Sequence, residues 1–90
     1  KGKAFENKKL GIAVSLGAPA SEYSAEGSVG YTVAETLRPF ELTANYISAD
    51  YQPLFAFHTI DTYESYDEAA AQQVADSADD YLAHLNTYYA

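Results

Sequence analysis

The residues best suited to chemistry gather in one segment, residues 15–31, which reads SLGAPASEYSAEGSVGY. Gly17, Gly27 and Gly30 open backbone conformations that are closed to other residues, so backbone N–H groups could closely approach a planar ligand. Tyr23 adds a ring that could close over such a ligand. Most loops between a strand and a helix have ~2–6 residues, and those beyond ~12–15 are usually functional or disordered. The segment predicts a ligand-binding loop, with a mobile surface loop as the alternative.

Other chemical motifs are weak. The chain contains no G-x-S-x-G, no G-x-x-x-x-G-K-[ST] and no G-x-G-x-x-G sequence. His58 and His84 are far apart and lack a third ligand at a metal-binding spacing. We expect His58 to be a structural histidine near the end of a strand and His84 to lie in the last turns of a helix. Asp79 and Asp80 are interpreted as solvated surface, and no metal site is predicted.

Composition narrows the classes of partner. With 90 residues, of which 48% are hydrophobic, the chain indicates at most one small globular domain. No apolar run reaches the ~18–20 residues that span a bilayer, so we expect no membrane insertion. A net charge of −8 argues against nucleic acid as a partner.

The absence of Cys excludes disulfides and thiolate chemistry and fits a cytoplasmic location. Because Met is also absent, we expect a piece of a longer protein.

The elements that must position the loop follow a β-α-β-α order. Apolar runs at residues 10–16 and 54–59 predict strands buried on both faces, as in a parallel sheet. Pro53 precedes the second run, where a strand tolerates proline. Strands joined by a helix lie parallel with a right-handed connection. Because two such strands are too few to stand alone, the rest of a doubly wound sheet is expected outside the chain.

Two helices are predicted. Thr32 and Glu35 form a capping box, which leads into a short turn at residues 33–37 and a main helix to about Ser48, interrupted at Pro39. The apolar face of this region comprises Val33, Leu37, Phe40, Ala44 and Ile47.

The second helix is expected to begin at a capping box formed by Ser65 and Glu68, with Asp67 favourable in the first turn. Its apolar stripe comprises Ala70, Val74, Ala78, Tyr81, Leu82 and Leu85, and its outer face comprises Gln72, Gln73, Asp76, Asp79 and Asp80.

Several motifs occur in a telling order: Lys8-Lys9-Leu10, Gly17-Ala18-Pro19, Glu22-Tyr23, Gly27, Gly30-Tyr31 and Leu37-Arg38-Pro39-Phe40-Glu41. Together they resemble the flavodoxin-like NAD(P)H:quinone oxidoreductases, specifically the smaller bacterial quinone reductases. The resemblance covers residues 3–85 and corresponds to the C-terminal half of that domain, so residues 1–90 are expected to be a single fragment of it. The implied fold class is α/β, the β-α-β-α half of a doubly wound parallel sheet.

The resemblance implies a flavin-dependent reductase, usually a homodimer, that passes hydride from NADPH or NADH through FMN to a quinone-like acceptor. Tyr23 would pack near the flavin and donate its hydroxyl to the reacting system. The cofactor-binding residues would be Ser15, Leu16, Gly17, Ala18, Tyr23, Gly27 and Gly30. FMN is favoured over FAD because nothing after Tyr89 could form an adenine-binding extension.

The chain also departs from the family pattern. Leu16 replaces a Thr, Ala18 replaces a Gly, and Val29 stands where the larger quinone reductases have a His. Proton transfer would therefore fall to Tyr23 or to solvent. Two alternatives stay open: a flavodoxin-like regulatory or interaction subunit, and a fragment that is inactive on its own.

Overall fold

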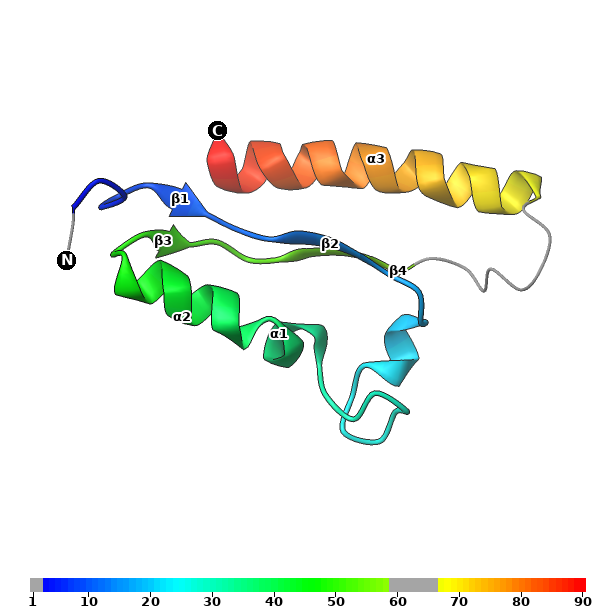
Figure 1. Ribbon diagram of the computed structural model, residues 1–90. Coiled ribbons are helices and arrows are strands. Elements are labelled where there is room, and N and C mark those ends of the chain that lie inside the picture. The colour runs from blue at the N-terminus through cyan, green and yellow to red at the C-terminus, as the bar shows by residue number, and fades with distance from the viewer. Residues whose placement is uncertain (1–2, 59–66) are drawn as a thin grey trace.

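The computed structural model describes residues 3–58 and 67–90. A ribbon of parallel strands lies between a long helix on one side and two short helices on the other (Figure 1). In chain order the elements are β1 (Lys9–Leu10), β2 (Ala13–Leu16), the 3-10 helix η1 (Ala20–Glu22), α1 (Val33–Thr36), α2 (Arg38–Tyr46), β3 (Asp50–Tyr51), β4 (Phe55–His58) and α3 (Glu68–Tyr89).

The first predicted strand, residues 10–16, is divided into β1 and β2, and the second, residues 54–59, corresponds to β4, with the short strand β3 before it where no strand was predicted. β1 pairs with β3 and β2 pairs with β4, both in parallel, as the sequence predicted. Lys9 lies opposite Asp50, whereas Ala13 lies opposite Phe55, so the second strand carries one extra residue between the two ladders. Pro53 falls in this interval, where its missing N–H costs no ladder hydrogen bond.

The prediction of strands buried on both faces is wrong within this chain. In β2, Ala13 and Ser15 are exposed, and their neighbours Val14 and Leu16 are only half-buried. The reason is that β2 has one neighbouring strand, β4, among the described residues, and that α3 packs against β4. β2 therefore has the apolar sequence of a strand buried on both faces, but the described residues do not bury it on both faces.

The region before β3 follows its local sequence signals closely. Thr32 caps α1 through a hydrogen bond from the Glu35 N–H to its side chain (3.1 Å), and the Glu35 carboxylate accepts from the Thr32 N–H (2.9 Å). Pro39 stands in the first turn of α2, which ends at Tyr46, two residues before the predicted end at Ser48. Ser48 adopts a left-handed conformation (φ 64°), which turns the chain out of the helix toward β3.

The capping box makes a testable prediction about pH. The hydrogen bond from the Thr32 backbone N–H, then that from its side chain, lowers the pKa of Glu35. A lowered folded-state pKa contributes stability that is complete above the unfolded pKa and is lost as the pH falls through the folded pKa. We therefore expect Glu35→Gln to be less stable than the parent at neutral pH, with the gap closing on acidification. Urea unfolding from neutral to acidic pH measures the difference in the free energy of unfolding between the parent and Glu35→Gln. A difference that does not shrink at acidic pH would contradict the assignment.

Helix α3 begins at Glu68, with Asp67 as its cap: the Ala70 N–H donates to the Asp67 carboxylate (2.8 Å). The predicted cap, Ser65, lies outside the described residues. The predicted polar face is exposed, including Asp79 and Asp80.

The predicted apolar faces of the helices are only partly covered. In α3, Ala70 is buried and Leu85 is half-buried, but the large side chains Val74 and Leu82 are exposed. In α2, Ala44 is buried and Phe40 is exposed. Apolar surface therefore remains open on both sides of the ribbon.

Candidate functional site

The carboxyl end of the ribbon carries the predicted site residues. Ser15 and Leu16 are the last residues of β2, and Leu16 is paired with His58 at the last rung of the ladder. Gly17 and Ala18 follow directly and begin the loop that leads to α1. Ligands of open α/β sheets bind outside the carboxyl ends of the strands, so this is the end of the ribbon where a ligand is expected.

The loop is folded upon itself rather than extended. Its anchor is Glu22, whose backbone carbonyl accepts a hydrogen bond from the Val29 N–H (3.1 Å) and whose carboxylate accepts one from the Ser28 N–H (3.3 Å). The Gly27 N–H donates to the side chain of Ser24 (3.1 Å), which closes a tight turn at the tip. The loop is therefore a compact structure with its own internal hydrogen bonds.

The loop glycines serve different purposes. A side chain at Gly27 would collide with the backbone of Glu22, and Gly30 adopts φ +83°, so both glycines are required by the loop itself. Gly17 is different, because a Cβ atom built there meets no atom within 4 Å. Among the described residues, the hydrogen bonds that shape the loop leave out the backbone N–H groups of Gly17 and Ala18. The backbone at Gly17 is therefore open on the side where a Cβ atom would point.

Tyr23 is brought against a residue that the sequence analysis did not place in the site. Its ring lies edge-on to His58, with ring centroids 5.3 Å apart and an interplanar angle of 61°. As predicted, His58 lies at the end of a strand with a hydrogen-bonding partner, because its Nδ1 lies 3.1 Å from the Ala18 carbonyl oxygen. The signal that could have placed it was strand alignment: His58 ends the second strand as Leu16 ends the first, so it must lie beside the start of the loop.

Positive charge does not gather at the loop. Lys8 and Lys9 lie at the amino end of the ribbon, opposite the loop (Figure 1). Arg38 faces Glu41 at 3.9 Å in an exposed pair of little energetic value. In the described part of the chain, an anionic ligand would depend on backbone N–H groups and ring contacts.

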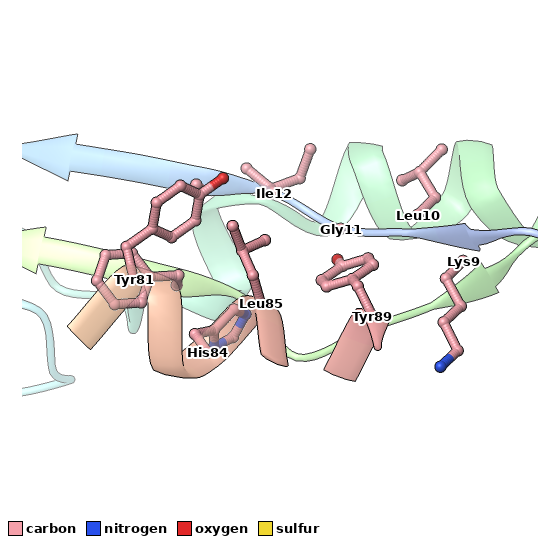
Figure 2. Close-up of a pocket in the computed structure, with 10 residues that line it drawn as sticks. Lys9, Leu10, Gly11, Ile12, Tyr81, His84, Leu85 and Tyr89 are labelled. Carbon is pink, nitrogen blue, oxygen red and sulfur yellow. The ribbon is translucent and has the colours of Figure 1, made fainter. Parts of the chain in front are cut away.

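A hollow of about 360 Å³ lies at the amino end of the ribbon (Figure 2). It is formed by β1, the residues that follow it and the last turns of α3, with Tyr89 close to Gly11. Burial, followed by the neighbouring Tyr81 and Tyr51, raises the pKa of Tyr89. His84, which lines the hollow, also packs against Tyr88, with ring centroids 4.8 Å apart and an interplanar angle of 56°. We assign this hollow to packing because it lies away from the carboxyl ends of the strands and is lined mainly by apolar and aromatic side chains.

The described residues show two further features. No three His, Asp or Glu side chains among them come together in a way that could hold a metal ion. None of the described helices combines the length and apolar character that crossing a bilayer requires.

Comparison with known proteins identifies the fold. Residues 1–85 match a family model described as "Flavodoxin-like fold", and the chain belongs to this family. The predicted α/β class with parallel strands is thereby confirmed, and the described structure is a partial version of that fold.

Three relatives are informative. General stress protein 14 of Treponema denticola, solved in complex with FMN, is 57% identical and superposes with a TM-score of 0.86 over 96% of this chain and 45% of its own. The uncharacterized NAD(P)H oxidoreductase YrkL of Bacillus subtilis (strain 168) is 44% identical over 60% of this chain and 31% of its own. An NADPH-quinone reductase from P. pentosaceus is 30% identical, with a TM-score of 0.61 over 80% of this chain and 42% of its own. The chain thus spans less than half the length of each.

Proposed function

We propose that this chain is the C-terminal half of a flavodoxin-like domain that binds FMN and transfers hydride from NAD(P)H to a quinone-like acceptor. The observation that carries the proposal is the loop at the carboxyl end of β2, where a Cβ atom built on Gly17 meets no atom within 4 Å and the hydrogen bonds that shape the loop, among the described residues, leave out the N–H groups of Gly17 and Ala18. The FMN complex of the Treponema denticola relative supports the cofactor, and the names of YrkL and of the P. pentosaceus enzyme support the reaction.

The chain's own residues would divide the work as follows. The N–H groups of Gly17 and Ala18 would face the polar edge of the isoalloxazine, and Ser15 and Leu16 would border it. Tyr23 would cover the ring and supply a hydroxyl that can hold or donate a proton. FMN, when bound, supplies the two-electron hydride chemistry, and the protein orients it and shields it from side reactions.

The direct test uses the purified complete protein. We expect a yellow protein containing FMN that oxidises NADPH or NADH when a quinone is added. A yellow protein that oxidises neither would favour a flavin-binding regulatory subunit over an enzyme. A colourless protein that does not take up added FMN would contradict the proposal. Sedimentation of the same sample tests the homodimer that the family resemblance implies.

Gly17→Val provides a sharper test of the cofactor site. Because a Cβ atom at this position meets nothing within 4 Å, the fold accommodates a side chain there, whereas a ligand lying against the backbone would not. We expect FMN binding to weaken at least about tenfold, which corresponds to about 1.4 kcal/mol, while the melting temperature of the FMN-free protein stays close to that of the parent.

Gly27→Ala is the matched control, since its Cβ atom would collide with the Glu22 backbone and so disturb the loop itself. It should lower the melting temperature of the FMN-free protein as well as the affinity for FMN. Unchanged FMN affinity in Gly17→Val would show that the cofactor lies elsewhere.

A further inference from the structure

We propose that His58 is a positioning residue that holds both parts of the loop, the backbone at Ala18 and the ring of Tyr23, against the end of the sheet. This inference rests on the proposed function, in which the backbone at Ala18 and the ring of Tyr23 contact FMN. It adds a residue that neither the loop sequence nor the family resemblance indicated.

The first part of the argument is the hydrogen bond to the loop. The Nδ1 atom of His58 lies 3.1 Å from the carbonyl oxygen of Ala18, 40 residues away in sequence. A carbonyl oxygen can only accept, so Nδ1 must carry the proton and donate it, which leaves Nε2 unprotonated in the neutral ring. The bond fixes the backbone immediately after Gly17, the glycine whose Cβ position meets no atom within 4 Å.

The second part is the contact with Tyr23. This residue ends the 3-10 helix η1, and its ring meets that of His58 edge to face at 5.3 Å. Such contacts contribute beyond simple burial and have a preferred geometry, so His58 restricts where the ring of Tyr23 can lie. One side chain therefore restrains the loop at two points five residues apart.

The third part is that His58 is itself well placed to serve as an anchor. Its backbone belongs to the last described rung of the parallel ladder, opposite Leu16. The backbone at His58 is thus set by the sheet, and the imidazole transfers that position to the loop. Because fixing a flexible loop before a ligand arrives reduces the entropy cost of binding, this restraint favours cofactor affinity.

His84 shows what a purely structural histidine looks like in the same chain. It is also half-buried and also packs against aromatic rings, Phe55 at 5.4 Å and Tyr88 at 4.8 Å. These contacts are near the hollow at the amino end of the ribbon and do not involve the loop. His84 therefore offers a matched control of the same residue type.

The experiment compares three variants of the complete protein. His58→Phe keeps a ring against Tyr23 but removes the donor to Ala18, and His58→Asn keeps a donor close to the position of Nδ1 but removes the ring. His84→Phe is the control. We expect His58→Phe to bind FMN about 3- to 10-fold more weakly, the effect of losing one hydrogen bond, and His58→Asn to recover part of that loss. His84→Phe should bind FMN like the parent.

Two measurements do not depend on FMN or on turnover. Nitrogen NMR of the FMN-free parent should show His58 with the proton on Nδ1, and hydrogen exchange should be faster across residues 17–29 in His58→Phe but not in His84→Phe. A parent that does not bind FMN but shows these two results would overturn the proposed function and leave the positioning role standing. A His58 proton on Nε2, or unchanged exchange and FMN affinity in His58→Phe, would overturn the positioning role.

Discussion

Replacing Tyr23 with Phe in the complete protein is expected to lower quinone turnover about 100-fold while changing FMN affinity less than about threefold. The substitution removes only the hydroxyl. The phenyl ring retains the shape that packs edge-on to His58 at 5.3 Å, so the loop should keep its position. Because Val29 stands where the larger quinone reductases have a histidine, we expect the hydroxyl of Tyr23 to supply the proton.

Steady-state turnover with saturating NADPH and quinone, together with the flavin content of each sample, measures the two effects separately. Tyr31→Phe is the matched control, since Tyr31 lies in the same segment and 61% of it is exposed. It should retain the turnover of the parent. If Tyr23→Phe also keeps parental turnover, the catalytic role of Tyr23 is wrong, and solvent would be left to supply the proton.

Local signals predicted the elements that depend on a few neighbouring residues. The capping box of Thr32 and Glu35 is present with both hydrogen bonds, and Pro39 stands in the first turn of the helix that follows. The parallel pairing also followed from sequence, because two apolar runs joined by a helix leave little choice. Strand ends were less predictable, since the irregularity around Pro53 depends on the register between two strands that are distant in sequence.

Sequence reasoning could indicate the segment that holds the candidate site, but not how its residues are arranged in space. The glycines and Tyr23 indicated a functional loop. Gly27 and Gly30, however, are needed for the backbone conformation of the loop, and residue type alone does not distinguish that need from ligand binding. The pairing of Tyr23 with His58 is a contact across 35 positions, and it becomes visible only when the strands are aligned. The apolar runs likewise predicted strands buried on both faces, which this chain alone does not bury. Such a run reflects the environment of the strand in the whole fold.

That mismatch leads to the second expected result, which concerns residues 1–90 in isolation. We expect the isolated chain to show no cooperative urea unfolding as a monomer and to associate as its concentration rises. Its buried hydrophobic residues among those described are Ala44, Ala49 and Ala70, and no large side chain is fully buried. The other apolar side chains of the described residues keep part of their surface exposed, so we expect the apolar area that the isolated chain buries not to offset the entropy of ordering it.

The dimensions of the chain support this expectation. Its accessible surface is 6532 Å², whereas a folded monomer of this mass exposes about 5,200 Å². Its radius of gyration is 15.7 Å, compared with about 12 Å for a compact domain of 90 residues. Both the accessible surface and the radius of gyration are larger because the described structure is flat, only 16 Å in its shortest dimension.

The exposed edge should decide how the isolated chain behaves. Within the described residues, β2 pairs on one side with β4 and has no strand on the other. An exposed strand edge can pair with a strand of another chain, which makes association the expected outcome. Adding the N-terminal half that we propose for the complete protein should suppress association and protect the amides of residues 10–16 from exchange. A compact monomer of the chain alone, with those amides already protected, would show that β2 is not an interior strand awaiting a neighbour.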